Sequence, residues 1–354
     1  MREQRDTVGV AHGAVAPRRI DPTGERGPTK SQAAGRHWRR TGKGLYVPAA
    51  VVLTPEQRIA EVGAGLPARG AAVTGWAALR WRGGSWFGGL DAGGDPVPVP
   101  VAQRARLTRP RPGLRLCEER RDPGSTEQVD GVPTTAAVQA LAWAVRYAPT
   151  LAEAVVAADM ALFDDLLSPH ELAEWVWSHP SWTGIAQART VLGLLEENSW
   201  SPQETRMRLA WVDAVPGAGL VANRPVFDLH GRHLGTPDLL DPAAGVCAEY
   251  AGDVHLTRER RSEDLRRIDR LRAAGLRVVD AVAGDLGPRG PLGARLRSAY
   301  ADAVGAPASA RAWTLEPPPS WCLTHTVARR LALTPGERAV FLRYRRPVDL
   351  RRTG

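Results

Sequence analysis

Residues 235–250, GTPDLLDPAAGVCAEY, are the stretch that decides the fold of this chain. They comprise two short segments, 235–240 and 246–250, separated by the turn-like sequence DPAAG. The first segment contains Asp238 and the second contains Glu249. Two antiparallel strands joined by such a turn bring these two carboxylates side by side. Paired carboxylates on rigid strands provide the oxygen ligands that a hard divalent cation such as Mg²⁺ requires.

The sequence on either side of this stretch predicts a complete α/β unit. Ser201-Pro202-Gln203-Glu204 has the form of a capping box with proline at the first helical position, so we expect a helix to begin there. A strongly charged helix is expected from about Thr257 to Ala274, with Gly275 as the residue that ends it. Strands are expected near 219–229, 232–240, 245–250 and 276–279. The predicted order is α-β-β-β-α-β, with three antiparallel strands and a last strand added in parallel.

Composition excludes several classes of protein. The chain has 354 residues and is 43% hydrophobic, which is typical of a globular protein with a real core. No uncharged apolar run approaches the length of a membrane span, and Val8 to Pro17 lacks the leucines of a signal peptide. Cys117, Cys247 and Cys322 lack the spacing of a zinc site. Three widely spaced cysteines predict a reduced, cytoplasmic protein without a disulfide framework.

Positive charge is concentrated at the two ends of the chain. The net charge is +9, and residues 1–50 contain ten basic and four acidic residues. Residues 329–354 contain eight basic and two acidic residues, so the remainder of the chain is slightly acidic. Basic termini around a near-neutral body favour contact with a polyanion such as DNA, although solvated tails have the same composition. The candidate phosphate contacts in the N-terminal region are Arg39, Arg40 and Lys43.

Three motifs resemble one nuclease family. They are SPQETRMR at 201–208, TPD at 236–238 and EYAGDVH at 249–255. Together they resemble the restriction-endonuclease-like PD-(D/E)XK superfamily. Within that superfamily they are most similar to the very-short-patch-repair-like, DUF559-type endonuclease domain of many actinobacterial proteins. The resemblance covers about residues 199–285. Upstream, residues 38–47 and 73–79 look like pieces of the AbiEi-antitoxin-like region that often precedes this domain.

The composition and the resemblance together imply an α/β (α+β) protein with four parts. They are a disordered basic N-terminus at 1–35, an AbiEi-antitoxin-like mixed and mainly helical domain at 36–198, an endonuclease-like domain with a restriction-endonuclease-like αβββαβ core at 199–300, and a basic C-terminal tail with a short helix at 301–354.

The resemblance also implies roles for individual residues. Asp238 and Glu249 would bind Mg²⁺ or Mn²⁺, and Glu204 would be an outer or second-metal ligand. His255 would orient or deprotonate the attacking water, or protonate the leaving oxygen. Phosphate contacts on the charged helix are expected from Arg258, Arg260 and Arg261. The reaction would be the metal-dependent hydrolysis of a phosphodiester bond, with DNA as the partner and without an organic cofactor or a membrane.

Other interpretations of the same residues stay open. The superfamily has a lysine two residues after Glu249, where this chain has Ala251, and no lysine follows Lys43. Asp238 also fits a residue that begins a turn, and Glu204 also fits a purely structural capping residue. The sequence therefore leaves three functions open. They are a metal-dependent DNA endonuclease, a catalytically impaired nuclease-fold DNA-binding or antitoxin-like regulatory protein, and a plain interaction protein.

Overall fold

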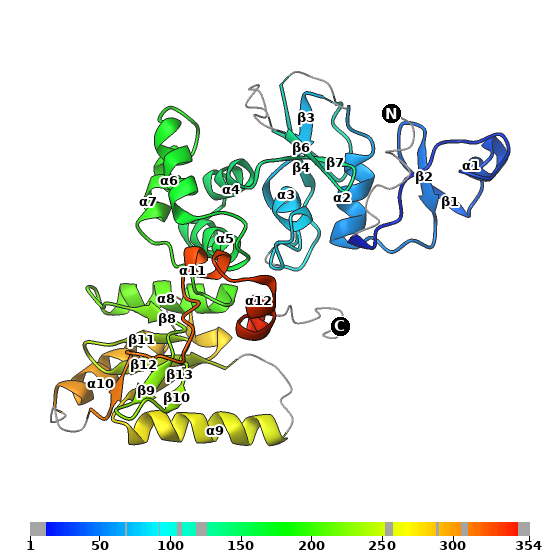
Figure 1. The fold of residues 1–354 in the computed structure, drawn as a ribbon. Coiled ribbons are helices and arrows are strands. Elements are labelled where there is room, and N and C mark those ends of the chain that lie inside the picture. Colours follow the sequence, from blue (N-terminus) through cyan, green and yellow to red (C-terminus); the bar gives the residue numbers. More distant parts are fainter. Residues whose placement is uncertain are drawn as a thin grey trace. The chain divides into compact units, whose positions relative to one another are not determined.

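The protein is mixed α/β, and its residues divide into two units in the computed structural model (Figure 1). The structure describes residues 12–67, 69–91, 93–104, 108–117, 126–251, 258–287, 290–305 and 311–345, and for 258–262 it describes the backbone alone. Unit 1 comprises the chain up to Pro149 together with Pro169–Leu192. Unit 2 comprises Thr150–Ser168 and the chain from Gly193 onwards.

Unit 1 is built around a five-stranded sheet with the strand order β5-β4-β3-β7-β6. Its strands are β3 (Ala71–Val73), β4 (Val99–Gln103), β5 (Leu114–Leu116), β6 (Thr126–Val129) and β7 (Val132–Thr135). Its larger helices are α2 (Pro55–Gly63), α3 (Gly75–Trp81), α4 (Ala137–Arg146), α6 (Pro169–Ser178) and α7 (Ile185–Leu192).

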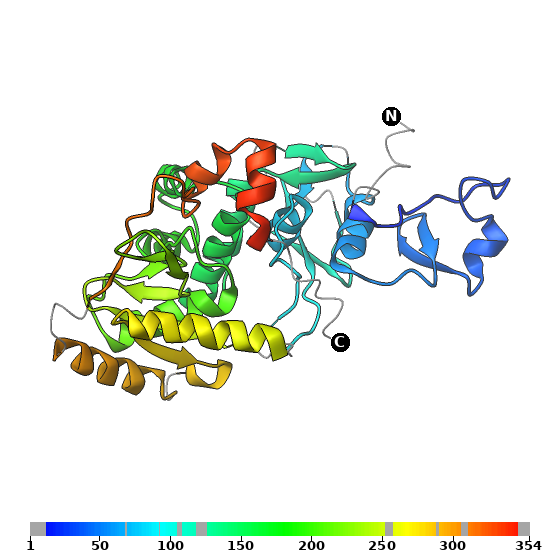
Figure 2. The ribbon, with the colours of Figure 1, turned by 60° about the horizontal axis from the view of Figure 1, so that its bottom comes forward.

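Residues 12–35 contain ordered elements, although their composition predicts disorder. Helix α1 (Lys30–Ala34) begins with a capping box between Thr29 and Gln32. Arg18 forms an isolated bridge to Tyr46 in the hairpin of β1 (Trp38–Gly42) and β2 (Leu45–Pro48), shown in blue in Figure 2. The described part of this segment has no apolar periodicity, and it is held by local hydrogen bonds and by contacts with residues distant in sequence.

Unit 2 has a central four-stranded mixed sheet with the strand order β13-β12-β11-β8. Its strands are β8 (Val221–Ala222), β11 (Leu239–Asp241), β12 (Val246–Tyr250) and β13 (Arg277–Ala281). β11 is antiparallel to both β8 and β12, whereas β13 is parallel to β12. Helix α8 (Pro202–Ala214) precedes the sheet, and α9 (Arg258–Ala273) lies between β12 and β13 in the chain. The predicted mixed sheet with a parallel last strand is confirmed.

Both faces of this sheet are covered by helices. Leu239 and Ala248 belong to a core that includes Trp211 of α8 and Leu296 of α10 (Leu292–Val304). On the other face, Cys247 belongs to a core that includes residues of α9. Figure 1 shows α8 and α9 on opposite sides of the strands. Because strands buried on both faces read as continuous apolar runs, Val246-Cys247-Ala248 lacks the alternation of a half-exposed strand.

Two of the predicted strands are each divided in two. The segment predicted at 219–229 forms β8 and β9 (Val226–Asp228), and that predicted at 232–240 contributes to β10 (His233–Gly235) and β11. β9 and β10 form a second sheet with β14 (Trp313–Thr314). Asn223 lies at the first break with a positive φ of 47°, a left-handed conformation that asparagine adopts more readily than most residues. Pro237, which cannot donate to a ladder, lies at the second break.

The basic C-terminal segment packs against α5 (Leu151–Phe163), which also belongs to unit 2. The segment contains α11 (Val327–Leu331), α12 (Pro335–Phe341) and a short 3₁₀ turn at Arg343–Arg345. Arg330 is completely buried, and its Nε donates to Asp165 Oδ1 at 2.7 Å. Arg338 and Arg345 also donate to Asp165. These three arginines of the predicted basic tail are therefore bound to one carboxylate.

Candidate functional site

Asp238 and Glu249 lie beside the end of the β11–β12 ladder. Asp238 directly precedes β11, whose first residue Leu239 pairs with Ala248, the neighbour of Glu249 in β12. The Tyr250 backbone N–H donates to Asp238 Oδ2 at 2.7 Å, which fixes that carboxylate beside β12. The charge of Asp238 also acts on Glu249 and raises its pKa.

Glu249 is a buried carboxylate with one oxygen bound and one oxygen without a partner. Its side chain lies on the α9 face of the sheet, where Arg267 Nη2 is 2.7 Å from Oε2. Oε1 is inaccessible to solvent and has no hydrogen-bond partner among the described residues. Burial, and then the charge of Asp238, raise the pKa of Glu249 to about 8 despite the nearby Arg267. A buried acceptor without a donor is costly, so this oxygen is suited to receive a ligand.

Arg267 reaches Glu249 because the sheet leaves room for it. Gly235 lies beneath the side chain, and a Cβ atom there would approach Arg267 Cγ to 2.9 Å. Arg267 Nη1 also donates to the Thr236 carbonyl at 3.1 Å. The sequence prediction missed this residue, because α9 contains so many arginines that none stands out. The signal it had was the spacing Asp264, Arg267, Leu271, which places all three residues on one side of the helix.

Glu204 lies at the start of α8, as the capping interpretation predicts, and its role as a metal ligand stays a prediction. Its carboxylate accepts from Ser201 Oγ at 3.0 Å and from the Trp200 N–H at 2.8 Å, as a capping residue does. It also accepts from Asn223 Nδ2 at 2.6 Å. Burial, followed by the charge of Asp238, raises the pKa of Glu204 to about 8. The capping carboxyl therefore belongs to the same electrostatic cluster as Asp238 and Glu249.

Asn223 links this cluster to the sheet and was also missed from the sequence. Its backbone N–H donates to the Asp238 carbonyl at 2.9 Å, while its side-chain amide holds Glu204. The positive φ that turns the chain at Asn223 is thus used to place one side chain between two carboxyl-bearing residues. Asn-Arg-Pro at 223–225 was a detectable turn signal, although it did not predict this contact.

The carboxyl cluster Glu204, Asp238 and Glu249 has electrostatics that favour a bound cation. Burial raises the pKa of Asp238 to about 6, although the Tyr250 N–H and Arg267 lower it. Buried carboxyls that raise one another's pKa are the arrangement that a divalent cation relieves. In the described part of the chain, no three His, Cys, Asp or Glu side chains are already positioned to hold a metal ion together. The donor set and the unbound Oε1 fit a hard cation, but its binding requires Arg267 to move away from Glu249.

We expect the stability of the metal-free protein to fall as pH rises from about 5 to 8. The folded-state pKa values of about 8 for Glu204 and Glu249 exceed the unfolded values of about 4.3, so the folded state binds more protons than the unfolded state between these values. Urea unfolding at several pH values in chelator measures the slope. In the Glu204→Gln/Glu249→Gln double variant the slope should flatten, and an unchanged slope would show that these carboxyls are ionised without cost.

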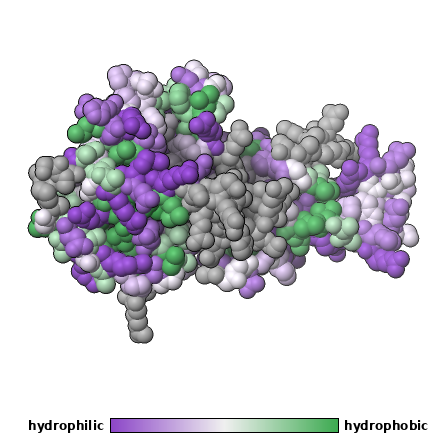
Figure 3. Space-filling view, turned by 90° about the horizontal axis from the view of Figure 1, so that it is seen from below, coloured by the Kyte–Doolittle hydropathy of each residue, from purple (hydrophilic) through white to green (hydrophobic). Residues whose placement is uncertain are grey.

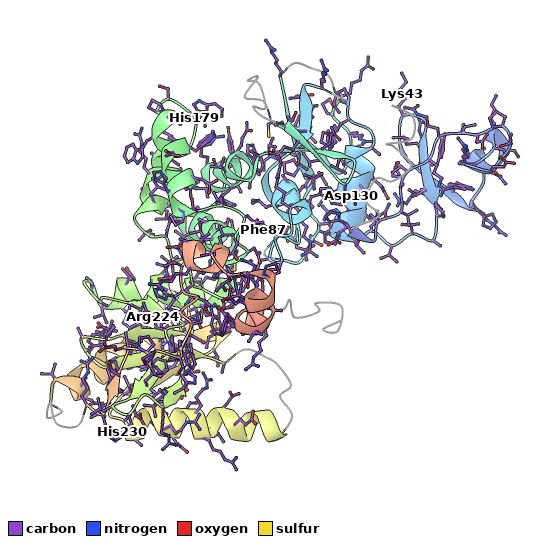
Figure 4. The ribbon with its side chains drawn as sticks, in the orientation of Figure 1. Lys43, Phe87, Asp130, His179, Arg224 and His230 are labelled. Carbon is purple, nitrogen blue, oxygen red and sulfur yellow. The ribbon has the colours of Figure 1, made fainter. Side chains whose placement is uncertain are left out.

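The other predicted site residues have different outcomes. His255 lies outside the described residues, and Arg258, Arg260 and Arg261 lie in α9 with side chains that are not described. Arg39 is not free for phosphate contact, because it forms a two-pronged ion pair with Glu61 at 2.7 and 2.8 Å. Arg40 and Lys43 are exposed on the β1–β2 hairpin, and Lys43 extends from its turn (Figure 4).

The face of unit 2 seen in Figure 3 is largely hydrophilic, with separate apolar patches. Among the described residues no helix is both long enough and apolar enough to cross a membrane. A scan against protein-family models, a search of curated proteins and a search of solved structures each return no match for this chain. The site is therefore interpreted from its own geometry.

Proposed function

We propose that unit 2 is a divalent-metal-dependent DNA endonuclease domain of the restriction-endonuclease-like PD-(D/E)XK type. The observation that carries this proposal is the approach of Asp238 to β12, where it accepts from the Tyr250 N–H and its charge acts on Glu249, whose buried Oε1 has no hydrogen-bond partner among the described residues. The strand order of the central sheet, with α8 before it and α9 between β12 and β13, supports the same interpretation.

Each residue of the carboxyl cluster and its neighbours has a separate role in such a site. Asp238 and Glu249, with Glu204 beside them, would hold Mg²⁺ or Mn²⁺. The ion, when bound, lowers the pKa of water and stabilises charge on the attacked phosphate. The Tyr250 N–H orients Asp238, and Asn223 orients Glu204. Proton transfer is assigned to His255 from the family resemblance.

Arg267 places a positive charge beside the carboxyl cluster. Ala251 is at the position of the superfamily lysine, and Arg267 from α9 places a guanidinium against Glu249 instead. Arginine stays protonated at every relevant pH. We therefore assign Arg267 to charge stabilisation once the metal has displaced it from Glu249, and exclude it from proton transfer.

A second candidate function is a DNA-binding or antitoxin-like regulator without catalysis. The ion pair between Arg267 and Glu249 favours it, because a guanidinium that stays at the carboxylate replaces the cation. The two candidates differ in whether metal displaces Arg267 or is irrelevant to the protein.

The test of the proposed function is cleavage of single- and double-stranded DNA and RNA with Mg²⁺, Mn²⁺ or chelator. We expect Asp238→Asn to reduce metal-dependent cleavage to below about one hundredth of wild type, because it removes a charged ligand. The matched control is Asp264→Asn, which removes a half-exposed carboxylate on the same side of the cluster and should retain most activity. Equal activity in both variants would place the chemistry elsewhere.

We expect DNA affinity to fall steeply with salt, and the Arg40→Gln/Lys43→Gln double variant to flatten this dependence. Each lost phosphate contact lowers the slope of log K against log salt by about 0.9. Substitution is preferable to deletion of residues 1–50, because Leu45 and Val47 are buried. Arg39→Gln is the control, since it breaks the Glu61 pair and should alter stability rather than slope. A double variant with wild-type salt dependence would move the DNA surface away from this hairpin.

A further inference from the structure

A cleft next to the carboxyl cluster is lined by aromatic side chains from three parts of unit 2. Its volume is about 420 Å³, within the range of small-molecule sites. The residues used below are Trp200, Asn223, Trp321, His325, Arg343 and Tyr344. The rings of Trp200 and Tyr344 stack with centroids 4.3 Å apart. The rings of Trp321 and buried Phe227 meet edge to face with centroids 4.9 Å apart, and Trp321 remains 38% exposed. The cleft therefore offers flat apolar faces that are partly open to solvent.

Two buried polar atoms in the lining have no partner. Asn223 is only 3% exposed, and its Oδ1 has no hydrogen-bond donor among the described residues. The same holds for Nδ1 of His325, which is likewise inaccessible to solvent. Burial and the neighbouring arginines 224, 329 and 330 lower the pKa of His325 to about 4, so its ring is neutral at physiological pH. An amide oxygen that accepts and an imidazole nitrogen that donates or accepts therefore await a ligand with complementary edges.

Asn223 and Trp200 belong to both the cleft and the surroundings of the carboxyl cluster. Asn223 lines the cleft, and its Nδ2 binds Glu204 while its backbone N–H binds the Asp238 carbonyl. Trp200 lines the cleft as well, and its backbone N–H binds Glu204. A ligand in the cleft would therefore contact residues that themselves bind Glu204 of the proposed cleavage site. Arg343 also lines the cleft and is exposed, so it is placed to contact a phosphate.

We propose that this cleft binds one unpaired nucleobase of the substrate, an inference that rests on the proposed nuclease function. A nucleobase has the flat face that aromatic side chains stack on and an edge of N–H donors and acceptors for Asn223 and His325. An aliphatic ligand would leave Asn223 Oδ1 unpaired, and a bare phosphate would not use the rings. The domain accordingly recognises a base that is extruded from a duplex or presented by a single strand.

The test measures binding of the four deoxynucleoside 5′-monophosphates to the full chain in chelator, by tryptophan fluorescence or NMR. Deoxyribose 5-phosphate is the probe without a base. We expect the nucleotides to bind and the sugar phosphate to bind at least about fivefold more weakly. Trp321→Leu should weaken nucleotide binding by about five- to a hundredfold. The matched control Trp177→Leu, which alters a more exposed tryptophan of α6, should have no effect.

A second variant keeps the proposal testable if Trp321→Leu does not fold. His325→Phe keeps a ring in place but removes both nitrogens, so we expect retained stacking and reduced discrimination among the four bases. Equal binding of the sugar phosphate and the nucleotides, or nucleotide binding that both variants leave unchanged, would overturn the proposal. These titrations need no metal, so they test the base pocket separately from cleavage. If nucleotides fail to bind but cleavage depends on Asp238, the base-pocket proposal is wrong and the nuclease proposal stands. If nucleotides bind but no cleavage occurs, the nuclease proposal is wrong and the base-pocket proposal stands.

Discussion

Glu249→Gln is expected to abolish the stabilisation of the protein by Mn²⁺ and to make the metal-free protein more stable above about pH 5. Glutamine keeps the size of the side chain but removes the charge that binds a cation. The pKa of Glu249 is about 8 in the folded state and about 4.3 in the unfolded chain, so the wild type loses stability as pH rises from about 4 to 8. Glutamine has no such ionisation. The difference should vanish near pH 4, should be about 2 kcal/mol at pH 6, and should reach a few kcal/mol at pH 9.

The stabilisation of the wild-type protein by Mn²⁺ has an expected magnitude. Mn²⁺ at a hundred times its dissociation constant stabilises the folded state by about 2.7 kcal/mol if it does not bind the unfolded chain. Thermal melts of both proteins at pH 6 and pH 9, with Mn²⁺ and with chelator, give all four comparisons. Asp264→Asn serves as a matched control that leaves the metal response in place. A Glu249→Gln variant that is less stable at pH 9, beside a wild type that ignores Mn²⁺, would show that the Arg267 pair is structural. The regulator function would then be the better interpretation.

Arg330→Ala is expected to destabilise unit 2 by about 3 kcal/mol, the lower end of the range for breaking a buried ion pair. Arg330 is fully buried, and its guanidinium also donates to the carbonyls of Leu162 and Thr324. Alanine removes a donor from each carbonyl and opens a cavity, although the Leu162 carbonyl still accepts from the Asp165 N–H. Asp165 retains Arg338 and Arg345, which keeps the expected cost from being larger.

The neighbouring arginine provides the control for this substitution. Arg329 lies in the same short helix with an exposed side chain, so Arg329→Ala should change stability by less than about 0.5 kcal/mol. Urea unfolding measures both variants. Chymotrypsin, which cleaves after aromatic residues, should cut the 321–344 segment faster in Arg330→Ala alone. Equal behaviour of the two variants would mean that Asp165 holds this segment through its other two arginines.

The sequence predicted features of unit 2 where the pattern was local, and failed where contacts were distant. The turn between 241 and 245 was enough to predict the antiparallel pairing of β11 with β12, because strand pairing across a short turn leaves few registers. Arg267 could not be selected among the arginines of α9, since the choice depends on which side of the helix meets the sheet. Asn223 contacts Asn198, Glu204 and Asp238, and the cleft brings Trp200 against Tyr344 from far along the chain. No local pattern in the sequence encodes such contacts.

The domain boundaries show the same limit. Pro149 and Pro169 lie on either side of α5 in the chain, and proline is typical of positions outside a helix interior. Whether α5 packs with the helices beside it in the chain or with the elements of unit 2 is decided by buried contacts. Asp159 of α5 forms an ion pair with Arg208 of α8, with Oδ2 and Nη2 2.8 Å apart, and both residues are almost completely buried. That ion pair, invisible in the sequence, assigns α5 to unit 2.

The path of α5 means that unit 2 is not a portable module. The chain enters unit 2 at Thr150, returns to unit 1 at Pro169, and re-enters unit 2 at Gly193. A fragment that starts at residue 193 would lack Asp159 and Asp165, and would strand Arg208 and Arg330 in the interior with no counter-charge. Gene fusions and recombination that splice at one point would therefore yield an unstable product. The two units are bound to be inherited, expressed and engineered as one piece.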